Sequence, residues 1–220
     1  MKSKSFWYKL LAHFTLLALL LTVVACQEEQ AAAPNFPTTE FISTTDLFSV
    51  KVPIGWHTEE VVPGANIVMA NTEAALERYD NDRAIESGDF VLNIGFLPMA
   101  LFQEKELAHL NFQFEASPDV FLQSLLPMFR IGNESAVNFA EDVTQVSLDN
   151  GRDAGMLPLS EGNREGQILV FTVSDKVFGF VSASGFPGQM DDFEEIAYGI
   201  ASNVTYSGDQ EALYQALNGD

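Results

Sequence analysis

The chain has 220 residues and an acidic composition, in which 31 aspartate and glutamate residues stand against 11 lysine and arginine residues and give a formal net charge of −20. This balance excludes nucleic acid as a partner, because the chain has no basic stripe that would release counterions from phosphate groups. The single cysteine excludes an intramolecular disulfide, so packing must hold the fold together.

The first 25 residues have the pattern of a bacterial leader peptide. Lys2, Lys4 and Lys9 come first, with no acidic residue among them, and an apolar run follows over 10–25. A membrane-spanning helix usually needs about 20 apolar residues, and this run is shorter and contains His13. The segment is therefore typical of an export signal rather than of a permanent span.

Cys26 stands directly after this run. Val23, three positions before it, and Ala25, just before it, resemble the bacterial lipobox. The resemblance implies that the Cys26 sulfur carries diacylglycerol, that the leader is cut before this residue, and that the new N-terminus is acylated, so that two or three acyl chains hold the protein stably on the membrane. The alternatives are an uncleaved anchor helix and an ordinary leader with an idle thiol. The lipobox predicts a protein anchored by lipid on a bacterial cell membrane and facing outward, into the periplasm or the cell exterior.

The chain after the leader divides into a tether and one domain. Loss of the leader removes three lysines and leaves 8 basic against 31 acidic residues, a net charge of −23. Anionic headgroups repel such a surface, so the lipid rather than the protein surface is expected to bind the membrane. Small, polar and proline residues without a period of 2 or 3.6 predict a flexible tether over 26–45. One domain of ordinary size is expected over 46–206, with a C-terminal tail over 207–220.

The domain pattern alternates between strands and a few helices. In chain order it predicts strands over 46–56, 65–71 and 88–98 with a short helix over 72–79, a helix over 117–129 that Pro127 bends or ends, strands over 143–148, 155–160, 167–174 and 177–186, and a final helix over 191–204. Asn150-Gly151 is the strongest hairpin signal.

Two of these strands decide the fold class. Residues 168–173 and 177–181 are apolar on both of the faces that alternate along a strand, so neither face of their sheet can lie in water. Helices must then cover both faces. The sequence predicts an α+β fold in which an antiparallel sheet lies between helices, an αβα sandwich.

The order of elements resembles the PsbP-like fold family. The resemblance rests on the opening FSVKVPIGW, the strand NIVMAN and the closing helix GFPGQMDDFEEIAYGIASNV, and it covers about residues 46–206. It implies the same αβα sandwich, and its bacterial members are small exported proteins or lipoproteins, the better-known ones being assembly or binding factors. The segment 98–117 and the tail 207–220 have no counterpart in the family pattern.

No residue pattern in the domain indicates catalysis, a metal site or a cofactor. His57 with Glu59 and Glu60 is the densest metal-type cluster, and a solvated turn after Trp56 explains it better. Asp80, Asp82 and Glu86 have a faint calcium-loop spacing, but the glycine and glutamate that such a loop needs are missing. Nucleophile elbows and glycine-rich phosphate loops are absent, and the chain is predicted not to be an enzyme.

The segment 98–117 carries more apolar side chains than a connection between a strand and a helix needs. They are Met99, Leu101, Phe102, Leu107, Leu110, Phe112 and Phe114. One interpretation is that the segment folds over the sheet as core, and the other is an exposed flap that takes a protein partner or an apolar ligand. The resulting hypothesis is a lipid-anchored binding or assembly module with an unidentified protein partner on the outer membrane face; the alternative is a carrier of a small apolar ligand beneath this segment.

Overall fold

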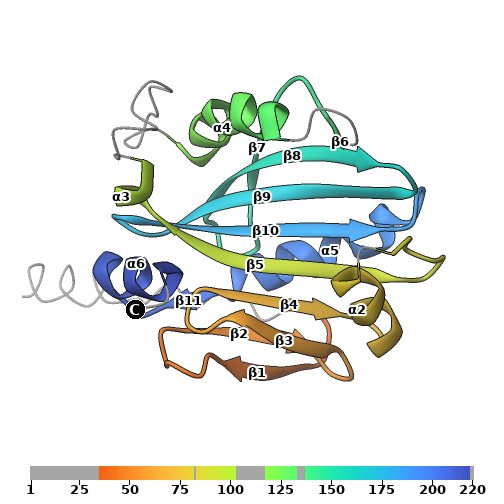
Figure 1. The fold of residues 1–220 in the computed structure, drawn as a ribbon, viewed down its shortest axis with the longest axis horizontal. Helices are drawn as coiled ribbons and strands as arrows, with labels where there is room; N and C mark the ends of the chain where they lie inside the picture. Colours follow the sequence, from red (N-terminus) through yellow and green to blue (C-terminus); the bar gives the residue numbers. More distant parts are fainter. Residues whose placement is uncertain (1–34, 82, 103–116, 133–136, 219–220) are drawn as a thin grey trace, which may run out of the picture. The chain divides into compact units, whose positions relative to one another are not determined.

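The computed structural model describes residues 35–81, 83–102, 117–132 and 137–218, and Figure 1 shows how their helices and strands are arranged. In this part of the chain the strands form two antiparallel sheets, one of three strands in the order β1-β2-β11 and one of eight strands. The larger sheet has the order β3-β4-β5-β10-β9-β8-β6, and β7 also pairs with β8.

The elements have the following bounds. The strands are β1 Thr38–Ile42, β2 Phe48–Pro53, β3 His57–Val62, β4 Asn66–Ala70, β5 Phe90–Pro98, β6 Val137–Phe139, β7 Thr144–Ser147, β8 Asp153–Glu161, β9 Arg164–Ser174, β10 Val177–Gly185 and β11 Thr205–Tyr206. The described helices are α2 Glu73–Asp80, α3 Met99–Phe102, α4 Pro118–Gly132, α5 Met190–Ser202 and α6 Gln210–Asn218.

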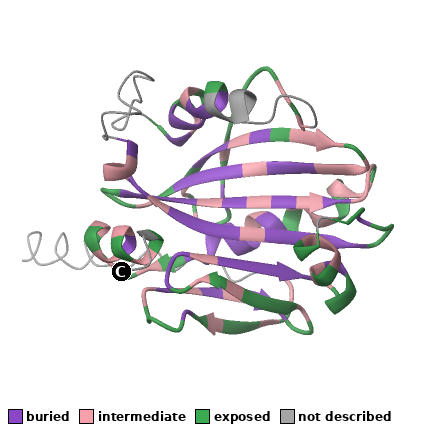
Figure 2. Cartoon of the chain, in the orientation of Figure 1, coloured by how far each residue is buried: buried purple, intermediate pink, exposed green. Residues whose placement is uncertain are grey.

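The middle of the larger sheet is apolar on both faces. Successive side chains of a strand point to opposite faces, so Leu169 and Phe171 of β9 lie on one face and Ile168 and Val170 on the other. Leu169 and Phe171 belong to the same buried cluster as Ile200 of α5, whereas Val170 is buried with residues of α4. Figure 2 shows the resulting band of buried residues along β5, β10 and β9.

Helix α4 packs tightly on β8 and β9. The ring of Phe121 in α4 stacks on that of Phe178 in the neighbouring strand β10, with the ring centroids 3.9 Å apart. The ring of Phe102 packs edge-on against Phe121, with the centroids 5.3 Å apart. A Cβ atom at Gly155 of β8 would lie 2.6 Å from the Cα of Asp119. Glycine at this position therefore lets the first turn of α4 approach the strand backbone directly.

The opposite face is covered jointly by α5 and the three-stranded sheet. Phe193 of α5 stacks on Phe90 of β5 at 4.2 Å, and Ile200 is fully buried. Val50 and Val52 of β2 are buried in the same cluster. The α+β class and the antiparallel sheet are confirmed, but complete cover of both faces by helices is not, because a second sheet takes part of this face.

Helix α4 does not end at Pro127. It continues to Gly132, beyond the point at which the sequence placed a bend or an end. A proline within a helix removes one backbone hydrogen bond and clashes with one preceding carbonyl. The apolar residues before Pro127 are buried in the α4 cluster, namely Leu122, Leu125 and Leu126. Tertiary packing therefore outweighs the local cost.

The folded unit begins earlier and ends later than the sequence indicated. Strand β1 lies within the segment 26–45 that was predicted to be a tether, and pairs with β2 from Thr38 to Ile42. Phe41 packs against the main cluster. The segment 207–220, predicted to be a tail, contains α6, whose Leu213 is fully buried. Few apolar residues in polar surroundings anchor both elements, Phe36 and Phe41 at β1 and Leu213 and Ala216 in α6, and so sparse a pattern is too weak to read from sequence.

Among the described residues, no helix has the length and apolar character that crossing a membrane requires.

Two truncated chains should differ in stability. A chain that starts at Asn35 keeps β1, whereas one that starts at Asp46 loses the ladder to β2 and the packing of Phe41. The shorter chain is expected to have a free energy of unfolding lower by about 1–3 kcal/mol, the usual contribution of one large buried apolar side chain. Denaturant unfolding of both chains measures the difference. Equal midpoints would show that β1 is not part of the cooperative unit.

Candidate functional site

The residues that the sequence singled out are distributed as follows. Cys26, Leu107, Leu110, Phe112 and Phe114 lie outside the described residues. Helix α3 holds the rest of the apolar set: Phe102 is 5% exposed, and Met99 and Leu101 are partly buried against the α4 cluster. The described part of the segment 98–117 thus packs as core, and the remaining part stays a prediction.

The cluster around His57 is a strand and not the turn that the sequence suggested. His57 and Glu59 are exposed on β3, which pairs with β4. The carboxylate of Glu60 accepts hydrogen bonds from the backbone N–H groups of Gly64 at 2.8 Å and Thr44 at 3.1 Å. Burial tends to raise the pKa of Glu60, but the hydrogen bonds from Gly64 and Thr44 outweigh burial and lower it. Among the described residues, no group of three or more His, Cys, Asp or Glu side chains could hold a metal ion.

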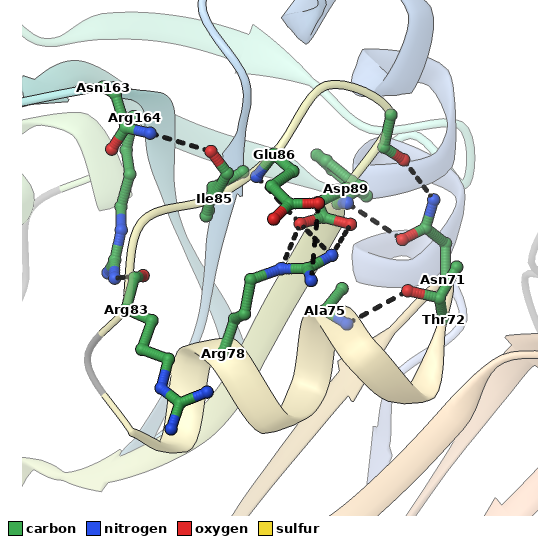
Figure 3. A network of polar contacts seen from close by, with 12 residues as sticks. Asn71, Thr72, Ala75, Arg78, Arg83, Ile85, Glu86, Asp89, Asn163 and Arg164 are labelled. Carbon is green, nitrogen blue, oxygen red and sulfur yellow. Dashed lines mark hydrogen bonds and ion pairs between the residues drawn. The ribbon is translucent and has the colours of Figure 1, made fainter.

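A polar network holds α2 against the start of β5, as Figure 3 shows. The Arg78 guanidinium donates to both carboxylate oxygens of Asp89 at 2.8 Å, and Asp89 also accepts from the backbone N–H of Glu86 at 2.9 Å. Asp89 is 4% exposed, so this is a buried carboxylate with its partners in place. The hydrogen bond to Asp89 raises the pKa of Arg78. The network fixes the loop before β5.

This loop is in turn tied to two other segments. Asn163 in the β8–β9 turn donates to the carbonyl of Ile85 at 2.7 Å. On the other side, the backbone N–H of Gly88 donates to the Gln189 side chain at 2.8 Å, directly before α5. The loop, the β8–β9 turn and the start of α5 therefore form one braced end of the larger sheet.

An open hollow of about 470 Å³ lies at this braced end. Strands β6, β8 and β9 and the first residue of α5 provide its lining, which consists of Asn138, Phe139, Ala140, Pro158, Leu159, Ser160, Glu165, Gly166, Gln167 and Met190. Gly185 helps to place Met190, because an added Cβ there would lie 3.3 Å from the Met190 sulfur. The hollow opens where α5 stops covering the sheet, since α5 packs on β10 and β9 and begins at Met190.

The pairing register brings the polar side chains of the hollow onto one face. Asn138 of β6 is paired with Ser160 of β8, and Ser160 with Glu165 of β9. Gln167 follows two residues after Glu165 and therefore points to the same face. Asn138, Ser160 and Glu165 therefore form a row across three strands, and this row and Gln167 line the same hollow.

These side chains have few partners within the described chain. Gln167 is only 8% exposed, and its Nε2 atom is buried without a hydrogen-bond partner there. Glu165 Oε2 accepts from the backbone N–H of Gly188 at 2.8 Å, which fixes the carboxylate. No described side-chain hydrogen bond joins Ser160 to Glu165, although the two residues are cross-strand neighbours. The arrangement can bind through hydrogen bonds, and among the described contacts no base is hydrogen-bonded to the Ser160 hydroxyl, as a serine nucleophile requires.

Sequence reasoning did not single out this site. Its only signal is Gln167, a polar residue at the start of the apolar stretch 167–174. The other members are separated by up to about thirty residues along the chain, and only the register of β6, β8 and β9 brings them together.

A second hollow, of about 460 Å³, lies between the β9–β10 turn and the start of α6. Asp209, one of its lining residues, accepts from the backbone N–H of Ala212 at 2.8 Å and so caps α6. Burial, together with the charge of Asp209, raises the pKa of the neighbouring Tyr206 to about 12. These contacts stabilise the start of α6.

The comparisons with known proteins find similarity to solved structures only. No protein-family model matches the chain, and neither does any curated protein. Among solved structures, cyanobacterial PsbP (CyanoP) from Synechocystis is 14% identical with a TM-score of 0.49 and covers 77% of this chain and 92% of its own. The Saccharomyces cerevisiae Ran-binding protein Mog1p is 11% identical with a TM-score of 0.40, over 84% of this chain and 92% of its own.

LpqN of Mycobacterium tuberculosis, described as involved in cell envelope biogenesis, is 12% identical with a TM-score of 0.35, over 79% of this chain and 87% of its own. At these identities the comparisons concern the fold alone.

Replacement of Gln167 by methionine should stabilise the unliganded protein. The variant keeps the length of the side chain and removes a buried amide whose Nε2 has no partner in the described chain, so the free energy of unfolding is expected to rise by about 1 kcal/mol. Gln145→Met, at an exposed position of β7, is the matched control and should change stability by less than about 0.5 kcal/mol. Denaturant unfolding compares the two, and a loss of stability in Gln167→Met would show that the amide is satisfied.

Proposed function

We propose that the chain is a lipid-anchored, extracytoplasmic binding or assembly module without a reaction of its own, held on the membrane by Cys26 and binding at the hollow between β6, β8 and β9. The observation that carries this proposal is the set of hydrogen-bonding side chains around that hollow, above all the buried and unpartnered Gln167. Buried polar groups are nearly always paired, so a group left unpaired at the edge of an open hollow is a candidate for contact with a ligand.

The composition of the hollow supports binding rather than catalysis. It contains one carboxylate, Glu165, which is already fixed by the backbone of Gly188. The remaining polar side chains of the lining, Asn138, Ser160 and Gln167, are uncharged. General acid and base catalysis requires a titrating group in contact with a reacting atom, and amides do not titrate in the usual range.

The lipid anchor follows from the leader and from the charge of the mature chain. A net charge of −23 opposes adsorption to anionic lipid, so a membrane location depends on the acyl chains of Cys26. The segment 27–37 between that residue and β1 spans at most about 40 Å when fully extended. The start of β1 would therefore lie within this distance of the lipid anchor.

Carriage of an apolar ligand beneath the segment 98–117 is the second candidate. Its described part offers little support, because Phe102 is buried against Phe121 and available only as core. The candidate depends on Leu107, Leu110, Phe112 and Phe114. Phe112→Asp should then remove a ligand mass seen by native mass spectrometry of protein isolated from its host.

Replacement of Cys26 by serine should release the protein from the membrane or leave it as uncleaved precursor. The change removes the sulfur that accepts diacylglycerol, and lipidation precedes cleavage at a lipobox. Labelling with a fatty acid and partition into detergent measure the outcome in the producing cells. Ser5→Ala, a small change within the leader, serves as the control and should be labelled and partitioned like the unchanged chain. Fatty-acid labelling of Cys26→Ser equal to that of the control would contradict the lipid anchor, whereas an unlabelled precursor that partitions through its uncut apolar leader would not.

A further inference from the structure

We propose that the hollow binds a neutral sugar unit of a glycan, through Asn138, Ser160, Glu165 and Gln167. This inference rests on the proposed function, since it names the ligand class of the same site. It does not depend on the lipid anchor, so the two can fail separately.

The need for a partner is clearest at Gln167. Its side chain lines the hollow while its Nε2 atom is buried and lacks a partner in the described chain. Asn138 and Ser160 also make no side-chain hydrogen bond among the described residues. Of the Glu165 carboxylate, Oε2 is engaged by Gly188, and Oε1 has no described partner. Hydrogen-bond donors and acceptors without a described partner therefore lie together in the lining of this hollow.

The charge and the mixture of groups restrict the ligand. Glu165 in the lining and a chain charge of −20 oppose an anion. A pure donor such as an ammonium ion would satisfy Glu165 but would leave the N–H groups of Asn138 and Gln167 without acceptors. A neutral group that both donates and accepts satisfies all four side chains. Hydroxyl groups have this property, and a sugar ring carries several of them.

The shape of the hollow favours a sugar over a peptide. Peptide recognition relies on large apolar anchors that fill well-enclosed pockets, whereas this hollow is open. The polar residues lie in a row across paired strands, Asn138 to Ser160 to Glu165, with neighbours about 5 Å apart. The lining also contains Ala140, Pro158 and Met190, and Pro158 is the cross-strand partner of Gln167. A sugar ring of similar width, with polar edges and an apolar C–H face, fits this row and the apolar residues beside it.

The binding test uses the full chain as its producing cells make it, in micelles of a zwitterionic detergent, because detergents with sugar headgroups would compete. Maltotriose, cellotriose and triacetylchitotriose are added separately, and the side-chain NH₂ signals of Asn138 and Gln167 are followed by ¹H–¹⁵N NMR. At least one trisaccharide should shift both signals in a saturable manner. Gln167→Met should weaken that binding about tenfold or more, since the ligand loses a buried hydrogen-bond partner, whereas Gln145→Met should bind normally.

The outcomes separate the competing explanations. If none of the trisaccharides shifts the two signals, or if Gln167→Met binds as tightly as the control, the sugar proposal is wrong. Saturable shifts with a short neutral peptide and none with the sugars would also overturn it, while leaving the binding module intact. Fatty-acid labelling of Cys26→Ser equal to that of the control would overturn only the lipid anchor, because the titration measures the folded domain.

Discussion

The structure depends on burying both faces of the β9–β10 hairpin. Leu169 and Val170 are adjacent in β9, point to opposite faces and are each no more than 1% exposed. Val181 of β10 lies opposite Leu169 and is fully buried. Water contact with either face would expose a continuous apolar strand pair, so the chain must provide two separate covers. Helix α4 provides one, and α5 with the three-stranded sheet provides the other.

The position of the hollow follows from this requirement. Cover is needed only where the strands are apolar, and Gln167 marks the point at which β9 becomes polar on the α5 side. Helix α5 begins at Met190 beside that point, and the loop fixed by Arg78 and Asp89 holds its start through Gly88. The same bracing that closes the core therefore leaves at its border a hollow whose lining includes four polar side chains. A site on a braced sheet can present hydrogen-bonding groups without reorganisation when a ligand binds.

The sequence predicted the parts of the fold that have strong periodicity. The strands over 167–174 and 177–186 and the helix over 191–204 lie where the pattern placed them, because long apolar repeats leave few alternatives. The pattern failed for β1 and α6, where few apolar side chains, chiefly Phe41 and Leu213, make the packing. The hollow could not be predicted, since its polar residues come from three strands and their meeting depends on register. The PsbP-like order of elements could be recognised because it is a property of the strong elements.

Native-state hydrogen exchange tests the central role of the β9–β10 hairpin most directly. Because this pair lies in the middle of the larger sheet under both covers, the amides of Val170 and Val181 should exchange only through global unfolding. The amides of β1 and β6, at the sheet edges of the described chain, should exchange through smaller openings at lower free energy. Exchange of Val170 and Val181 at a free energy equal to or below that of Thr39 and Asn138 would contradict the account.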